Sequence, residues 1–200
     1  MTEREMVRHS GMAAVTPWLA GRSVSAVIGV LAFVIMTALG AHVRIPLPWT
    51  PVPITLQTFF VPLAGATLGP ALGPASQAIY LLLGIAGLPV FAGGGSGIGY
   101  VLAGPTTGYL LGFIAASAIV GWLVRRRDDP GSAWILFSMA TGSLTIYVCG
   151  VAWLIWSVKL TLAGAIAKGF LPFLAGDVVK TGVAVGLFRG YRRRARNVFP

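Results

Sequence analysis

The segment Gly169–Phe188 constrains the fold of this chain more than any other part of the sequence. Its 20 residues, GFLPFLAGDVVKTGVAVGLF, are apolar almost throughout, yet Asp177 and Lys180 lie near its middle. Twenty such residues are enough to cross a bilayer as one helix. Each charge at the centre of a membrane costs roughly 2.5–3.5 kcal/mol on insertion scales. The segment therefore predicts a membrane helix that keeps two costly charges for a purpose.

The spacing of Asp177 and Lys180 places their side chains on one face of the predicted helix, about 60° apart around its axis. Together they offer a carboxylate that accepts hydrogen bonds and an ammonium that donates three. Two interpretations follow. The pair binds a ligand or an ion, or it neutralises itself and fixes the helix against its neighbours. We expect binding, because charges inside a membrane usually mark functional sites.

The composition of the whole chain indicates a membrane protein with several spans. Of its 200 residues, 56% are hydrophobic and only 10% are charged, unlike the composition of soluble domains. The net charge of +10 comes from basic residues at the ends of apolar segments, as membrane topology requires. These residues do not alternate with exposed aromatics on one face, so we expect no nucleic-acid partner.

Residues that build metal or catalytic sites are few and scattered. The chain has one cysteine, Cys149, and two histidines, His9 and His42, and no cluster has the spacing of metal ligands. It contains no G-x-S-x-G motif and no nucleotide-binding motif, and only one carboxylate lies within an apolar segment. We therefore expect no metal, no cofactor and no enzymatic activity.

Six apolar segments are predicted to form helices within a single transmembrane domain, residues 1–200. Their approximate ranges are 24–41, 54–70, 71–90, 107–124, 133–156 and 169–188. A polar N-terminus, residues 1–22, precedes them, and a basic tail, residues 189–200, follows. The first segment is 18 residues long, too long for the core of a signal peptide, so we expect an uncleaved helix. The predicted fold class is an all-α membrane protein.

The second segment is short for a span, and the distribution of basic residues decides its interpretation. If all six segments cross the membrane, the N-terminus, the loop Arg125–Arg127 and the C-terminal tail share one side. That side then holds 11 of the 15 basic residues. If the second segment does not cross, Arg125–Arg127 moves to the opposite side, against the positive-inside rule. We therefore predict six transmembrane helices with both termini in the cytoplasm.

Two loops predicted on the outer side have unusual compositions. Arg44–Gln57, RIPLPWTPVPITLQ, contains four prolines and cannot be helical. Because this loop is also apolar, we expect it to fold back over the bundle as a lid; the alternative is an interfacial segment anchored by Trp49. Phe91–Tyr100 contains five glycines without a phosphate-binding pattern. Backbone contact with a ligand and a flexible loop are both compatible with it.

The charged pair, the proline-rich loop and the glycine-rich loop all converge on the outer half of the predicted bundle. This arrangement predicts an apolar pocket with a few polar groups, open to the outside. On the first helix, small residues recur every four positions at Gly21, Ser25 and Gly29. Such a face permits close approach by another helix, from the same chain or from a partner.

Three stretches together resemble the BioY family, the biotin-specific substrate-binding subunits of energy-coupling-factor (ECF) transporters. They are PLPWTPVPITLQTFFVPLAGATLGPALG, YLLLGIAGLPVFAGGGSGIGYVLAGPTTGYLLGF and FLPFLAGDVVK. The resemblance covers roughly residues 45–113 and 169–180. It implies a multi-pass protein of the cell membrane that binds biotin with high affinity at the extracellular side. It also implies partners, namely a membrane-embedded coupling subunit and a pair of ATPases that energise uptake.

The resemblance further implies a set of site residues. Asp177 and Lys180 of the G-D-x-x-K element would belong to the biotin pocket, the loop 44–55 would lie over it, and 91–95 would line it. The expected ligand-binding residues are Asp177, Lys180, Phe91, Gly93, Thr55 and Gln57. Some members carry a polar side chain where this chain has Gly93, so that contact would be lost or made by backbone. The small-residue face of the first helix would dock the coupling subunit.

Biotin suits the predicted pocket chemically. Its ureido ring has two N–H donors and one carbonyl acceptor, and the rest is apolar apart from a carboxylate. Either the ureido ring or the carboxylate could meet Lys180. The alternative function is an ion-coupled secondary carrier of a small organic solute, with Asp177 as its proton or sodium site. The sequence also leaves open a structural subunit whose charged pair only locks helices, and a homo-oligomer.

Overall fold

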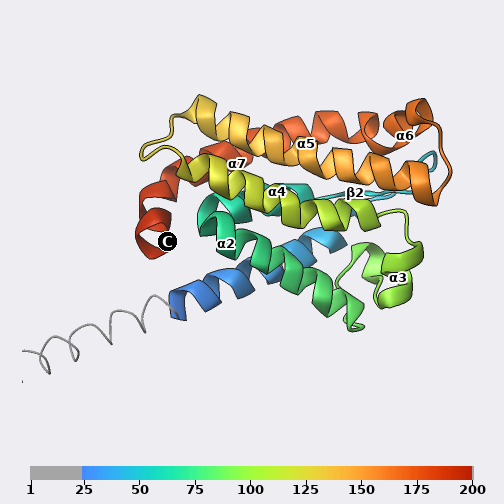
Figure 1. Ribbon diagram of the computed structural model, residues 1–200, viewed down its shortest axis with the longest axis horizontal. Coiled ribbons are helices and arrows are strands. Elements are labelled where there is room, and N and C mark those ends of the chain that lie inside the picture. Colours follow the sequence, from blue (N-terminus) through green and yellow to red (C-terminus); the bar gives the residue numbers. More distant parts are fainter. Residues whose placement is uncertain (1–23, 200) are drawn as a thin grey trace, which may run out of the picture.

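The computed structural model describes residues 24–199, which form a bundle of long helices (Figure 1). Five helices are long and apolar enough to cross a membrane. They are Val24–His42, α2 (Gln57–Ile85), α4 (Thr107–Arg125), α5 (Ser132–Ser157) and α7 (Leu171–Val198). The predicted class, an all-α membrane protein, is confirmed. The predicted polar N-terminus, residues 1–22, lies outside the described part of the chain.

Helix α2 folds back on itself at Gly69. This residue has φ 87° and ψ −175°, a conformation open almost only to glycine, and Pro70 follows it without a backbone donor. A Cβ atom on Gly73 would lie 2.9 Å from the Cα atom of Gly65, whereas eight residues of straight helix span about 12 Å. Figure 1 shows the two arms running from teal to green. The break coincides with the predicted boundary between the second and third segments; the count of six spans stays a prediction.

Helix α4 packs closely against both α2 and α5 through its glycines. A Cβ atom on Gly121 would lie 2.6 Å from the carbonyl carbon of Gly69, and one on Gly112 would lie 3.1 Å from the Cα atom of Ile146. In a membrane, helices gain most from such close backbone contact, because lipid is as apolar as their side chains. These contacts make α4 the central helix of the bundle.

The face of small residues on the first helix is partly covered by the chain itself. A Cβ atom on Gly29 would lie 2.7 Å from the ring of Phe199 and 2.9 Å from Leu68. Gly21, the first member of this face, lies outside the described residues. The sequence left open whether this face contacts the same chain or a partner. At Gly29 the same chain supplies the contact.

The proline-rich loop forms a short hairpin, as its lack of helical potential predicts. Strand β1 (Arg44–Ile45) pairs antiparallel with β2 (Ile54–Thr55), with Arg44 opposite Thr55. Near the tip Trp49 is exposed, but Val52 is buried. The hydroxyl of Thr50 donates a hydrogen bond to the carbonyl of Lys168, 2.7 Å away. The hairpin therefore lies back against the bundle, as expected of a lid.

Three short helices occupy regions where the sequence predicted loops. They are η1 (Ala92–Gly94), α3 (Ile98–Ala103) and α6 (Leu162–Gly169). The predicted ranges leave residues 157–168 between two spans, but most of this stretch is helical, since Thr161 caps α6 by accepting a hydrogen bond from the backbone of Gly164 at 3.2 Å. Helix α7 also continues beyond its apolar part through the basic tail to Val198.

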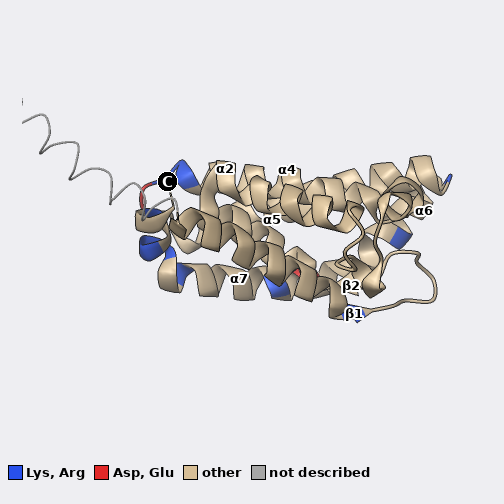
Figure 2. Cartoon of the chain, turned by 90° about the horizontal axis from the view of Figure 1, so that it is seen from below, with Lys and Arg blue, Asp and Glu red and all other residues tan. Residues whose placement is uncertain are grey.

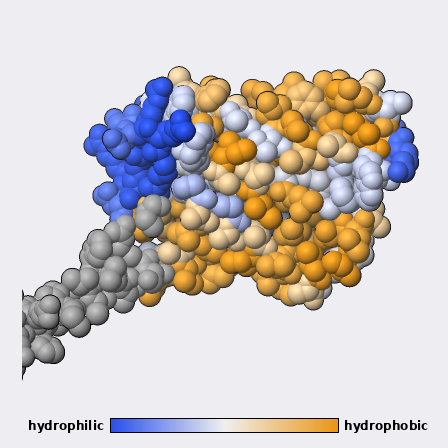
Figure 3. All heavy atoms as spheres, in the orientation of Figure 1, coloured by the Kyte–Doolittle hydropathy of each residue, from blue (hydrophilic) through white to orange (hydrophobic). Residues whose placement is uncertain are grey.

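The charges divide the molecule into two ends. The basic end carries the loop after α4 and the C-terminal part of α7, where Lys and Arg gather (Figure 2). The opposite end carries the hairpin, α3 and α6, with few charges; we call it the pocket end, after the cavity described below. An apolar surface lies between these ends (Figure 3). This distribution is typical of a multi-pass membrane protein, while the side of the membrane that each end faces stays a prediction.

Candidate ligand-binding site

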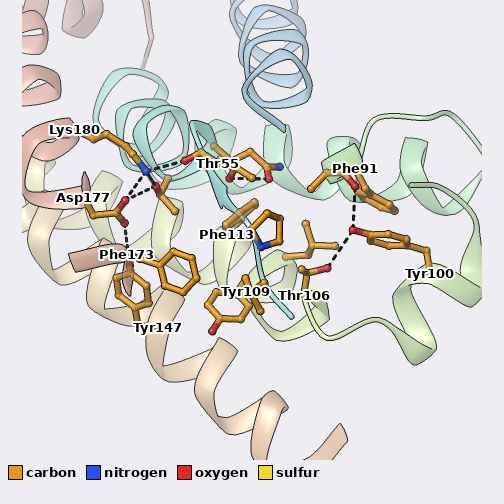
Figure 4. Close-up of a pocket in the computed structure, with 16 residues that line it drawn as sticks. Thr55, Phe91, Tyr100, Thr106, Tyr109, Phe113, Tyr147, Phe173, Asp177 and Lys180 are labelled. Carbon is orange, nitrogen blue, oxygen red and sulfur yellow. Dashed lines mark hydrogen bonds and ion pairs between the residues drawn. The ribbon is translucent and has the colours of Figure 1, made fainter. Parts of the chain in front are cut away.

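A cavity of ≈ 530 Å³, its open mouth included, lies at the pocket end (Figure 4). Apolar side chains with a few polar groups line it, as is typical of small-molecule sites. The hairpin, the start of α2, the glycine-rich loop, α4, α5 and α7 all contribute to its lining. Five of the six predicted site residues line it, namely Thr55, Gln57, Phe91, Asp177 and Lys180. The structure thus brings together residues that are more than 120 positions apart.

The predicted charged pair forms an ion pair inside the bundle. The Nζ atom of Lys180 lies 2.6 Å from Oδ1 of Asp177, and the two side chains are only 16% and 7% exposed. Both residues line the cavity. The sequence left two interpretations open, an ion pair that locks helices and a pair that binds a ligand. The geometry is compatible with both, because the pair is neutralised internally and still borders the cavity.

Four further hydrogen bonds hold this pair to other elements. Thr58, in the first turn of α2, donates to Oδ1 of Asp177 at 2.9 Å. Tyr147 of α5 donates to Oδ2 of Asp177 at 2.5 Å. Lys180 also donates to the carbonyl oxygen of Thr55 at 2.7 Å and to the hydroxyl of Thr58 at 2.9 Å. These bonds compensate part of the desolvation of the two buried ions. The bond to Thr55 also joins α7 to the hairpin.

Gln57 connects the hairpin to Val90, the residue just before the glycine-rich loop. Its Oε1 atom accepts a hydrogen bond from the hydroxyl of Thr55 at 3.2 Å, and its Nε2 atom donates to the hydroxyl of Tyr80 at 2.7 Å. Tyr80 in turn donates to the carbonyl of Val90 at 3.0 Å. A movement of either loop would therefore disturb the other through this chain of hydrogen bonds.

The glycine-rich loop contributes an aromatic wall to the cavity. Phe91 is fully buried, and its ring stacks on Tyr100 with centroids 5.1 Å apart and planes 19° apart. Gly93 lies outside the residues that line the cavity, whereas its neighbour Ala92 lines it. Gly93 has φ 76°, and a Cβ atom there would collide with the guanidinium of Arg44. A glycine at this position thus lets Arg44 approach the loop.

Sequence reasoning missed most of the aromatic lining. Tyr100, Tyr109, Phe113, Tyr147 and Phe173 all line the cavity. Four of them lie within apolar runs, where an aromatic residue carries no signal of its own, and Tyr100 ends the glycine-rich loop. The tyrosines offered one hint, because a phenolic hydroxyl in an apolar helix needs a hydrogen-bond partner. Tyr109, for example, donates to the carbonyl of Gly169 at 2.7 Å.

The described residues offer no metal site. Among residues 24–199, no group of three or more His, Cys, Asp or Glu side chains is close enough to hold a metal ion. The cavity instead combines one carboxylate, one ammonium, several hydroxyls and aromatic walls. Such a lining suits a small organic molecule with both hydrogen-bonding and apolar parts.

Comparison with known proteins identifies the family. A model of the BioY family matches residues 8–197, nearly the whole chain. The chain belongs to the BioY family. The resemblance predicted from the sequence is thereby confirmed, and membership accounts for the multi-pass membrane architecture.

Two curated relatives illustrate the similarity. The probable biotin transporter BioY of Pyrococcus horikoshii is 44% identical over 153 residues, which cover 76% of this chain and 87% of the relative. The biotin transporter BioY of Thermotoga maritima is 43% identical over 152 residues, covering 76% and 86% of the two chains. The aligned regions thus span most of each protein.

A solved structure shares the fold. The crystal structure of an S-component for biotin from an ECF-type ABC transporter matches with a TM-score of 0.79 at 24% sequence identity. The match covers 96% of this chain and 95% of the other. The overall helical arrangement of this family member therefore matches that of a solved membrane protein.

Proposed function

We propose that this chain is the biotin-binding membrane subunit of a biotin uptake system, energised by a partner ATPase module. The observation that carries the proposal is the buried Asp177–Lys180 pair, which borders an aromatic cavity of ≈ 530 Å³. Membership of the BioY family supports it, as do relatives named biotin transporters. The protein is a transport subunit rather than an enzyme.

The chemistry of biotin matches the cavity from end to end. The ureido ring presents N–H donors and a carbonyl acceptor, which suit Asp177 and Lys180. The thiophane ring and valeryl chain are apolar and suit the walls formed by Phe91, Phe113 and Phe173. Thr55 and Gln57 complete the proposed site on the side of the lid. In this arrangement the carboxylate of biotin lies away from Asp177, so the two carboxylates do not repel each other.

We place the carboxylate of biotin at the mouth of the cavity, toward Arg44. This residue lies on the hairpin opposite Thr55 and packs against Gly93 of the glycine-rich loop. Among residues 24–199 the acidic side chains are Asp128 and Asp129, in the loop after α4, and Asp177. None of these three lies on the hairpin, so the charge of Arg44 there would attract an anionic solute. In this proposal the ureido ring, and not the carboxylate of biotin, meets Lys180.

Energy for uptake comes, in this proposal, from an ECF coupling subunit and ATPase subunits. The chain contains no nucleotide-binding motif of its own. An ion-coupled carrier that uses Asp177 as its ion site has less support, because Oδ1 of that carboxylate already accepts hydrogen bonds from Lys180 and Thr58.

Calorimetric titration of the purified protein tests the binding function. We expect saturable binding of biotin at a stoichiometry of one, and none of thiamine or riboflavin at the same concentrations. Absence of biotin binding by the folded protein would refute the proposal. Energisation is tested in ATP-loaded proteoliposomes, where uptake should require the ATPase module and survive a protonophore; uptake by the chain alone that a protonophore abolishes would favour the ion-coupled carrier.

A further inference from the structure

Tyr147 lies between two separate spaces. On one side it lines the ligand cavity, and on the other it lines a groove between α5 and α7; Asp177 is the one other residue common to both linings. The rims of the groove include Leu144, Leu174 and Val178, whose side chains are exposed. Exposed aliphatic side chains on membrane helices face lipid. Tyr147 and Asp177 therefore form the wall between the ligand cavity and a lipid-facing groove.

The ring of Tyr147 is held by the beginning of α7. Its centroid lies 4.9 Å from that of Phe170, with the planes at 78°, and 6.3 Å from that of Phe173, with the planes at 27°. The residue is only 5% exposed. Aromatic contacts of this kind fix the ring plane, so the phenolic hydroxyl has one direction in which to point, and it meets Oδ2 of Asp177 at 2.5 Å.

A count of donors and acceptors shows which atoms of the charged pair have capacity left. An ammonium has three donors, and those of Lys180 meet Asp177, the hydroxyl of Thr58 and the carbonyl of Thr55. A carboxylate oxygen accepts about two hydrogen bonds. Oδ1 of Asp177 accepts from Lys180 and Thr58, whereas Oδ2 accepts a hydrogen bond from Tyr147 alone among residues 24–199.

We propose that Tyr147 is a positioning residue that sets how the substrate meets Asp177. It orients the carboxylate so that Oδ2 keeps one acceptor position for an N–H donor of the ligand, and its ring closes the cavity against the groove. This inference rests on the proposed function and names the group that is bound, a ureido N–H of biotin. A hydrogen-bond acceptor of the ligand can bind Lys180 only by displacing Thr55 or Thr58. Oδ2 of Asp177 can accept a hydrogen bond from the ligand without displacing any residue.

A double-mutant cycle in biotin binding tests this role. Tyr147→Phe keeps the ring and removes the hydroxyl, and we expect it to weaken binding about 10-fold, as for one hydrogen bond to a charged group. In an Asp177→Asn background the same change should weaken binding less than about 2-fold, because Tyr147 acts through that carboxylate. Equal losses in the two backgrounds would overturn the positioning role.

Two further variants test the wall and control for stability. Tyr147→Ala removes the ring, and we expect it to bind biotin about 10-fold more weakly than Tyr147→Phe. Equal binding by the two variants would show that the ring does not close the cavity against the groove. Tyr191→Phe is the matched control, because its hydroxyl bonds to Thr67 at 2.7 Å, outside the cavity lining. This control should bind as the wild type does.

A ligand variant supplies a readout that a general loss of structure would not move. A biotin analogue methylated on a ureido nitrogen lacks one N–H, and the wild type should bind it at least 10-fold more weakly than biotin. That ratio should shrink in Tyr147→Phe, and an unchanged ratio contradicts the inference. If the wild type does not bind biotin, the proposed function fails; if it binds but the cycle is additive, this inference alone fails.

Discussion

Among the described residues, helix α7 takes part in three ion pairs, and two of them, Lys180–Asp177 and Arg192–Asp129, contrast in burial. Lys180 and Asp177 belong to the same helix and border the cavity, with side chains 16% and 7% exposed. Arg192 joins α7 to Asp129 in the loop after α4, and the side chain of Asp129 is 69% exposed. Water screens the second pair, so it contributes little to stability. The first pair has lost most of its hydration, and its protein partners must compensate.

The difference shows where a charge indicates function. An exposed pair at the basic end is inexpensive to keep and can serve topology alone. A buried pair is often no more stabilising than apolar side chains of the same size. Its location beside an open cavity is therefore better explained by a ligand than by helix locking. The following predictions separate the two ends of α7 by experiment.

The largest effect is expected for Lys180→Met. The change leaves the carboxylate of Asp177 buried without its countercharge, which costs about 3–5 kcal/mol in comparable buried pairs. We expect a lower unfolding temperature by scanning fluorimetry and biotin binding at least 100-fold weaker by calorimetry. Lys159→Met is the matched control, since Lys159 lies outside the cavity lining, over the ring of Trp156. Wild-type behaviour of Lys180→Met would remove the contrast between the two pairs.

A smaller effect on stability is expected for Gly69→Ala. The backbone conformation of Gly69 is strained for any residue with a Cβ atom, at about 1–3 kcal/mol. The site lies at the fold of α2, where α4 packs, and outside the cavity lining. We expect the unfolding temperature to fall while the folded protein binds biotin within about 3-fold of the wild type. A selective loss of binding would mean that the two regions are coupled.

The smallest effect is expected for Asp129→Asn. An exposed ion pair contributes about 0–1 kcal/mol, so the unfolding temperature should change little. Biotin binding should not change, because Asp129 and Arg192 lie outside the cavity lining. Calorimetry and fluorimetry on this variant, beside Lys180→Met, measure the contrast directly. A loss of binding comparable to that of Lys180→Met would show that burial is not what distinguishes the pairs.

The sequence predicts the centre of the site but not its surroundings, for a physical reason. Asp177 and Lys180 stand out because two charges interrupt one apolar segment, a signal contained in 20 neighbouring residues. The hydrogen bonds from Thr58 and Tyr147 join residues 119 and 30 positions from Asp177. Only the packing of α2, α5 and α7 creates them, and a tyrosine or threonine in an apolar helix carries no local signal of that role.

The fold shows the same limit at its smaller elements. The change of direction near residue 70 could be predicted, because glycine and proline mark it locally. Helix α6 is not predicted, although Thr161 provides a capping signal, because its 8 residues are too few to stand out beside the long apolar spans. The position of Gly93 beside Arg44 depends on contact between two loops that lie far apart in sequence. Loop-to-loop contacts of this kind require the tertiary structure.

Calorimetric titration of biotin into Asp177→Asn/Lys180→Met tests the central claim most directly. Removing both charges together leaves no unpaired buried ion, so this variant should remain folded, with an unfolding temperature near that of the wild type. The account predicts that this folded variant no longer binds biotin at concentrations that saturate the wild type. Binding as tight as that of the wild type would contradict it and would reduce the pair to a lock between helices.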